Sequence, residues 1–111
     1  MIVELTRIVT FEAAHRLPAV PDGHSYTVEI TVRGAVDPIT GFFIDYEDIQ
    51  QAWAPLHKAL DHRYLNEIEG LENPSTEVLA GWIWERLDVP GLHKLTIQET
   101  GKERCTYRGE V

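Results

Sequence analysis

Two stretches near the start of the chain, residues 2–15 and 24–33, alternate between apolar and polar side chains. A period of two residues is typical of strands that bury one face. Pro18, Pro21 and Gly23 lie between the stretches, so the sequence predicts a turn that joins them into a hairpin. The apolar phase runs through Val3, Leu5, Val9, Phe11, Ala13 and His15 in the first stretch and through Tyr26, Val28, Ile30 and Val32 in the second.

A helical period follows twice in the middle of the chain. Asp45 is a good N-cap for the first helix, and Pro55 inside that helix predicts a bend or a restart. Residues 73–77, with the sequence NPSTE, form a second helix-start signal, and residues 89–91, VPG, end the second helix. The apolar positions at helical spacing are Ile49, Trp53, Leu56 and Leu60, and then Val78, Leu79, Trp82, Ile83 and Leu87.

Alternation returns over residues 92–100, and Gly101 predicts a turn into a last strand through Cys105 and Tyr107. No linker, repeat or low-complexity tract divides residues 1–111, so we expect a single domain. The order β-β-α-α-β-β predicts an α+β fold, with a four-stranded antiparallel sheet covered on one face by two helices. Because the edges of such a sheet are open to pairing with other copies, we also expect a homo-oligomer.

Composition excludes several classes of function. The chain of 111 residues carries 18 acidic and 10 basic side chains, a formal charge of −8, which argues against a nucleic-acid partner. The single cysteine, Cys105, excludes an internal disulfide framework and a cysteine-based zinc knuckle. No apolar run is long enough to span a bilayer and the first ten residues alternate, so we expect no membrane partner and a cytoplasmic protein.

Two histidines and an aspartate share the apolar phase at the predicted hairpin turn. His15 ends that phase in the first strand, His24 begins it in the second, and Asp22 lies in phase with His24. In a hairpin these side chains can be cross-strand neighbours. They are either ligands of a metal ion or polar caps at the end of the core that hydrogen-bond to backbone or water.

Two further features carry candidate chemistry. Glu99 occupies an apolar phase, and a buried carboxylate needs either a basic partner, such as Arg104 or Arg108, or a ligand with paired N–H groups. Asp61 and His62 follow the first helix. Such a pair can orient an imidazole for proton transfer, although helix ends also carry both residue types for capping and dipole reasons.

Six segments that span nearly the whole chain carry a resemblance to a known family. In chain order they read FEAAHRL, GHSYTVEI, GFFIDYEDI, LDHRYLN, PSTEVLAGWIWERL, and ET followed by CTYRGE. Together they resemble the 6-pyruvoyl-tetrahydropterin synthases and the related bacterial 6-carboxytetrahydropterin synthases. The resemblance implies the family's T-fold, a hexamer built as a dimer of trimers, and active sites at subunit interfaces.

The resemblance also implies roles for individual residues. Glu99 corresponds to the glutamate that pairs with the amino and imino N–H groups of the pterin ring. Ser75 and Thr76 match positions that help to hold the same ring, and Asp61 and His62 match the family's catalytic relay. The part of the site that recognises a pterin-like ligand is therefore expected in this chain.

The metal-binding part departs from the family pattern. Family enzymes bind zinc through three histidines, one in an AAH segment and two in an HGH segment. His15 and His24 match two of them, but HGH reads DGH here and places Asp22 at the third position. The loop that carries the family's reactive cysteine is reduced to RLPAVP. We therefore expect a lost metal site, no cofactor, and no standard zinc-dependent synthase reaction.

Three hypotheses about function follow. The first is a pterin-binding oligomer that acts on a pterin-like ring by other chemistry, with Asp61 and His62 as the proton-transfer pair. The second is an active lyase on 7,8-dihydroneopterin triphosphate, with zinc held by His15, Asp22 and His24. The third is a pterin sensor or scaffold without catalysis.

Overall fold

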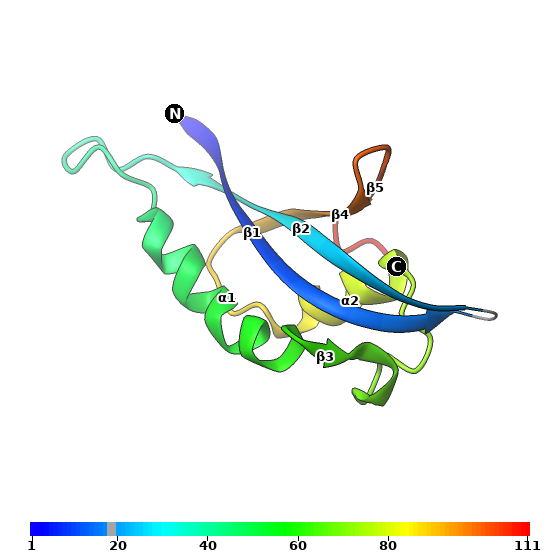
Figure 1. Ribbon diagram of the computed structural model, residues 1–111. Helices are drawn as coiled ribbons and strands as arrows, with labels where there is room; N and C mark the ends of the chain where they lie inside the picture. Colours follow the sequence, from blue (N-terminus) through cyan, green and yellow to red (C-terminus); the bar gives the residue numbers. More distant parts are fainter. Residues whose placement is uncertain (18–19) are drawn as a thin grey trace.

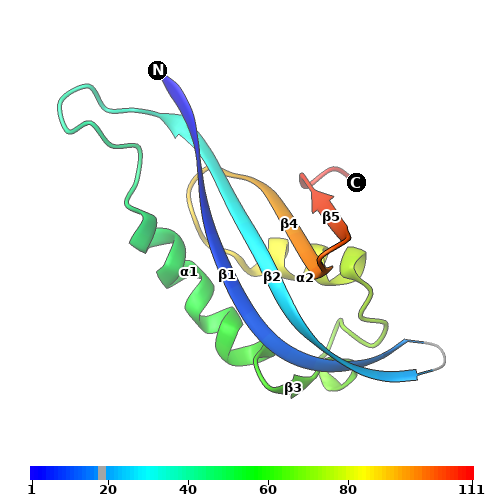
Figure 2. The same ribbon diagram turned by 45° about the horizontal axis from the view of Figure 1, so that its top comes forward.

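The computed structural model describes residues 1–17 and 20–111, without the side chains of residues 16–23. Its strands form one sheet with the order β3-β1-β2-β4-β5, and the helices α1 and α2 lie on one face of it (Figures 1 and 2). The elements are β1 (Ile2–Leu17), β2 (Val20–Ala35), α1 (Tyr46–Leu60), β3 (Arg63–Tyr64), the 3-10 helix η1 (Leu65–Glu67), α2 (Thr76–Arg86), β4 (Leu92–Thr100) and β5 (Glu103–Tyr107).

The predicted α+β class and the two helices between the hairpins are confirmed, with one addition. Strand β3 pairs in parallel with β1, at Ala13–Arg63 and Ala14–Tyr64, so the sheet is mixed and has five strands. The other three pairings are antiparallel, as the sequence predicts. A strand of two residues is too short to show a period, which is why the sequence pattern missed it.

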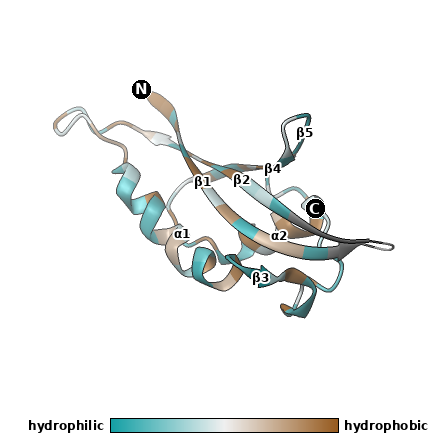
Figure 3. Ribbon diagram, in the orientation of Figure 1, coloured by the Kyte–Doolittle hydropathy of each residue, from teal (hydrophilic) through white to brown (hydrophobic). Residues whose placement is uncertain are grey.

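The core lies between the sheet and the helices, and the apolar phase of β1 and β2 faces it. Figure 3 shows this alternation of apolar and polar residues along the two long strands. Phe11 stacks on Tyr26 with ring centroids 4.7 Å apart and also contacts Trp53 at 5.9 Å. All three side chains are buried. This aromatic cluster packs the hairpin against α1, next to the hairpin positions that carry His24 and His15.

Local signals account for both helices. Asp45 accepts a hydrogen bond from the backbone N–H of Glu47 and forms a capping box with Asp48 at the start of α1. The helix continues through Pro55 as one element, so of the predicted bend or restart the restart is wrong and the bend stays a prediction. Ser75 caps α2 by accepting a hydrogen bond from the N–H of Val78. Among the described residues, no helix is both long and apolar enough to cross a membrane.

Candidate functional site

The end of the β1–β2 hairpin brings His15 and His24 together. Across the hairpin His15 pairs with Asp22 and Ala13 pairs with His24, so both imidazoles lie on the face that carries the core. The two rings are stacked, with centroids 4.8 Å apart and an angle of 17° between their planes. The side chain of His15 is only 4% exposed. The side chain of Asp22, the third predicted candidate, lies outside the described residues.

The carboxylate of Glu99 reaches this pair from strand β4. Its Oε1 lies 3.2 Å from Nε2 of His15 and accepts a hydrogen bond of 3.0 Å from the hydroxyl of Tyr26. Within the described part of the chain, no ion pair joins Glu99 to Arg104 or Arg108, the basic partners that the sequence suggested. The neighbours of this acid are instead provided by β1 and β2.

These side chains could hold a divalent metal ion. His15, His24 and Glu99 each offer one ligand atom, and the three atoms lie within 4.8 Å of one another. Both ring nitrogens of His15 are buried and make no hydrogen bond to any described group. Two imidazoles and a carboxylate are donors that zinc accepts. The sequence led us to expect a lost metal site, but the folded chain brings a third donor, Glu99, to the two histidines, and the sequence had not assigned it to a metal.

Asp61 and His62 lie where the chain leaves α1 for β3. Asp61 Oδ1 accepts a hydrogen bond of 2.9 Å from the backbone N–H of Glu12 in β1. The other oxygen, Oδ2, lies 2.7 Å from Nδ1 of His62 and 3.4 Å from Nε2 of His57. The backbone N–H of His62 also donates to the carbonyl of Glu12, at 2.6 Å. The pair is therefore fastened to β1 by two backbone hydrogen bonds.

The backbone N–H of Glu12 and the charge of Asp61 favour one tautomer of His62. The N–H of Glu12, followed by the hydrogen bond to His62, lowers the pKa of Asp61 below its usual value, so the carboxylate stays ionised at neutral pH. An ionised acid at Nδ1 holds the proton there and leaves Nε2 free to accept one. His62 has φ of 56°, which is rare for a residue with a side chain and occurs often at functional sites.

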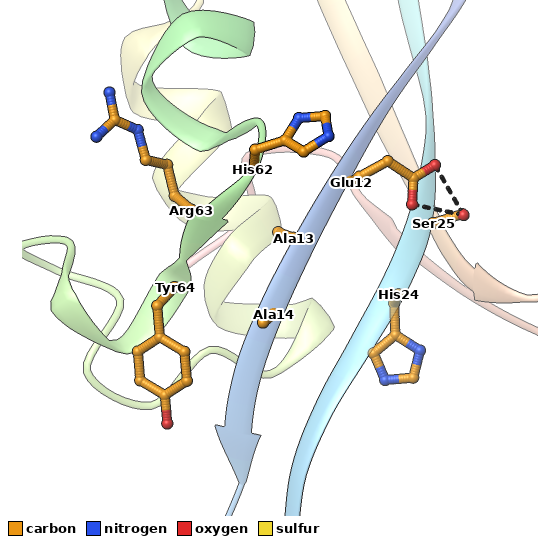
Figure 4. A pocket seen from close by; sticks show the side chains of 8 residues that line it. All are labelled: Glu12, Ala13, Ala14, His24, Ser25, His62, Arg63 and Tyr64. Atoms are coloured by element: carbon orange, nitrogen blue, oxygen red, sulfur yellow. Dashed lines mark hydrogen bonds between the residues drawn. The ribbon is translucent and has the colours of Figure 1, made fainter.

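A pocket of about 460 Å³ connects His62 to His24 (Figure 4). This volume lies within the usual range for small-molecule sites. The hydroxyl of Ser25 lies 2.8 and 2.7 Å from the two carboxylate oxygens of Glu12 at the same pocket. The sequence pattern singled out neither Glu12 nor Ser25, because polar residues are expected on the solvent-facing side of a strand. The pocket is lined by Glu12, Ala13, Ala14, His24, Ser25, His62, Arg63 and Tyr64.

A second, smaller cavity of about 90 Å³ lies on the other side of Glu99. It is too small to enclose a bicyclic ring and can receive only one edge of it. Thr76 lines this cavity, whereas the hydroxyl oxygen of Ser75 caps α2. Cys105 also lines it. Burial, together with the charge of Glu77, raises the pKa of its thiol, so Cys105 stays protonated and is a poor nucleophile.

Comparisons with known proteins find similar sequences and a similar structure. Residues 4–110 match the family model described as 6-pyruvoyl tetrahydropterin synthase. The chain is 36% identical to the 6-carboxy-5,6,7,8-tetrahydropterin synthase of Synechocystis sp., over 88% of this chain and 87% of that protein. It is 39% identical to the 6-pyruvoyl tetrahydrobiopterin synthase of Drosophila melanogaster, over 95% of this chain and 79% of that protein.

Two further relatives are a protein with a different enzyme name and a protein of known structure. The dihydroneopterin monophosphate aldolase of Pyrococcus furiosus is 35% identical, over 78% of this chain and 77% of that protein. The solved structure of the Caenorhabditis elegans 6-pyruvoyl tetrahydropterin synthase superimposes with a TM-score of 0.92 at 29% identity, covering 99% of this chain and 97% of that one.

Proposed function

Because the chain belongs to the 6-pyruvoyl tetrahydropterin synthase family, as its sequence resemblance predicted, we propose that it binds a pterin-like ring and processes the side chain of that ring. The proposal depends on one observation above all. An ionised Asp61, held by the backbone of Glu12, lies 2.7 Å from Nδ1 of His62, and His62 lines the pocket of about 460 Å³. Such a pair is suited to moving a proton to and from a bound substrate.

His62 acts as the general base and acid in this proposal. Its Nε2 removes a proton from the substrate side chain, and Asp61 stabilises the imidazolium that forms. The side chain of His62 is 79% exposed, which gives a substrate direct access to it. The fixed backbone of residues 61 and 62 keeps the imidazole beside the pocket, so little reorganisation is needed during the reaction.

Glu99 and Thr76 hold the edge of the ring. A carboxylate oxygen accepts hydrogen bonds from N–H groups, and these charge-assisted bonds are stronger than neutral ones. The cavity beside Glu99 has room for such an edge, and Thr76 adds a hydroxyl there. Ser75 remains a predicted contributor, although its oxygen already caps α2.

His15 and His24 would hold zinc at this site. A bound zinc ion would polarise oxygen atoms of the substrate side chain. The family's cysteine loop is absent from this sequence and Cys105 is protonated, so the chain has no nucleophilic thiol to offer. We therefore propose a reaction that needs one acid–base pair, outside the standard synthase reaction. The aldolase name of the Pyrococcus furiosus relative supports such a difference in chemistry within the family.

A second candidate function is the zinc-dependent synthase reaction on 7,8-dihydroneopterin triphosphate. Two observations favour it: three metal donors lie together, and relatives that are 36% and 39% identical are named as synthases. The two candidates differ in their products. The synthase reaction would yield a 6-pyruvoyl or 6-carboxy pterin, and the leading candidate would yield another product.

Product analysis separates the two candidates. The purified protein is incubated with 7,8-dihydroneopterin triphosphate or with 7,8-dihydroneopterin, with and without added zinc, and the pterins are identified by mass spectrometry. We expect turnover to a product other than a 6-pyruvoyl or 6-carboxy pterin. A 6-pyruvoyl or 6-carboxy product would establish the second candidate. Calorimetric binding without any turnover would favour the sensor or scaffold.

Binding of the ring is tested with Glu99→Gln. The change keeps the size of the side chain and removes the charge, so we expect affinity for 7,8-dihydroneopterin to fall about tenfold or more. Glu85→Gln is the matched control, because Glu85 is 77% exposed on α2 and lies 3.7 Å from Arg86, away from the candidate site. Equal affinity in both variants would contradict the assignment of Glu99.

We also propose that the protein assembles as a hexamer, a dimer of trimers, as the resemblance implies. Strand β3 covers the outer edge of β1 only at Ala13 and Ala14, and β5 forms the other edge of the sheet. Ile8 is 61% exposed on β1. Free edges and exposed apolar side chains favour pairing with other copies. Native mass spectrometry should detect six chains, and a monomer would contradict this proposal.

A further inference from the structure

We propose that Glu99 is the third protein ligand of a divalent metal ion held by His15 and His24, and that the same carboxylate connects this ion to the cavity for the ring edge. The ligand assignment depends only on the three side chains. The connection to the ring depends on the function proposed above.

The spacing of the donor atoms carries the assignment. A tetrahedral zinc ion with bonds of about 2.1 Å places any two of its ligand atoms roughly 3.4 Å apart. Oε1 of Glu99 lies 3.2 Å from Nε2 of His15, close to that spacing. The two groups are near enough for an ion pair, yet Nε2 makes no aligned hydrogen bond to any described group. Two donors at ligand spacing, with no aligned hydrogen bond between them, are placed where they could share a cation.

The burial of His15 is the second observation. Its side chain is 4% exposed and both of its ring nitrogens lack a hydrogen-bond partner in the described structure. A buried polar group without a partner destabilises a fold, so such groups usually have a ligand. His24 lies alongside with its ring stacked 4.8 Å away, and it contributes the third ligand atom of the group.

Tyr26 holds the carboxylate in place. Its hydroxyl donates to Oε1 of Glu99 at 3.0 Å, and its ring is fully buried and stacked on Phe11. Carboxylates that bind metals are themselves oriented by hydrogen bonds of this kind. The core therefore positions Glu99 toward the histidines, and the side chain does not depend on a ligand to keep that direction.

Glu99 also lines the cavity that contains Thr76 and Cys105. Ligation through Oε1 leaves Oε2 for an N–H group of the ring. One carboxylate then contacts the metal and the ring together, which brings the side chain of the ring close to the ion. This explains how a chain with DGH in place of HGH could still complete a site with three protein ligands.

Metal titration in the absence of any pterin tests the ligand assignment. Purified wild-type protein, Glu99→Gln, Asp22→Asn and Glu85→Gln are stripped with a chelator and titrated with Zn²⁺ by calorimetry and with Co²⁺ by visible absorption. We expect one site per chain in the wild type, and a loss of affinity of about a hundredfold in Glu99→Gln, with a weaker tetrahedral Co²⁺ band. Glu85→Gln should match the wild type.

The alternative third ligand gives a different result. If Asp22→Asn loses the metal and Glu99→Gln binds it as tightly as the wild type, the assignment to Glu99 is wrong. It is also wrong if no variant changes the affinity or if the wild type binds no metal. Circular dichroism of each variant separates loss of a ligand from loss of the fold, and Glu99→Asp supplies a shorter carboxylate as a second variant.

The connection to the ring is tested separately. Thr76→Val should weaken the binding of 7,8-dihydroneopterin and leave Zn²⁺ affinity unchanged, whereas Glu99→Gln should weaken both. If Glu99→Gln weakens only the metal, the ligand assignment stands and the role of Glu99 in ring binding fails. If the wild type binds zinc through Glu99 but no pterin at all, the proposed function fails and the metal site remains.

Discussion

The carboxylate of Asp61 lies 2.7 Å from Nδ1 of His62, although the two residues are neighbours in the chain and their side chains could easily point apart. The pairing depends on strand β1, because the backbone of Glu12 donates to Asp61 and accepts from His62. A positive φ at His62 completes the turn that makes both contacts. The structure thus joins the end of α1 to the hairpin beside the pocket that His62 and His24 line.

His62→Gln should lower the turnover number of the pterin reaction by about a hundredfold, because a general base commonly contributes that much. The Michaelis constant should change little, since the ring is held elsewhere, by Glu99 and Thr76. Steady-state kinetics measure both constants. His57→Gln is the control, because His57 lies 3.4 Å from Asp61 but does not line the pocket. Equal losses in the two variants would contradict the assigned role of His62.

Asp61→Asn should reduce thermal stability in a pH-dependent way. The folded-state pKa of Asp61 lies below its unfolded-state value, so the ionised carboxylate stabilises the fold above about pH 4. That stabilisation is lost as the pH falls through the lower folded-state pKa. The difference in Tm between wild type and variant should therefore be largest near pH 7 and shrink from about pH 4 downward. Melting curves at several pH values check this, and a constant difference would disprove it.

Ser75→Ala should lower the free energy of unfolding by about 1 kcal/mol, because the N–H of Val78 loses its capping oxygen. Ser75→Asn should restore most of that stability, since asparagine caps helices about as well as serine does. Denaturant unfolding measures both variants. If Ser75→Asn were as unstable as Ser75→Ala, the capping role of Ser75 would be contradicted.

Gly91→Ala should be clearly more destabilising than Gly41→Ala. Both glycines have positive φ, 73° and 79°, which costs an alanine about 1 kcal/mol or more. A Cβ at Gly91 would also lie 2.5 Å from the carbonyl oxygen of Arg33, whereas none of the described atoms lies within 4 Å of one at Gly41. The added clash should cost a further ~1–3 kcal/mol. Equal losses in chemical denaturation would contradict the close approach of β2 and residue 91.

The sequence alone determined the main elements of the fold. The strands follow from an alternation of apolar and polar residues with a period of two, and the helices from apolar residues three or four positions apart. Asp45 and Ser75 mark the starts of the helices. All of these signals act over a few residues. Pro55 misled the local reading, because the surrounding helix tolerates it on its exposed side. The sequence pattern could not predict the parallel pairing of β3 with β1, because a strand of two residues shows no alternation.

Only the tertiary structure decided which functional groups meet. Glu99 was recognised as an acid in an apolar phase, but its approach to His15 depends on β4 pairing with β2 and on the hydroxyl of Tyr26. The partner of Asp61 is a backbone N–H of Glu12, and a backbone group leaves no trace in the sequence. Periods and caps are set by neighbours along the chain, whereas a site is set by strand register and by close packing between distant segments. For that reason the sequence predicted the elements of this protein and most of its candidate residues, and the folded chain determined how those residues can act together.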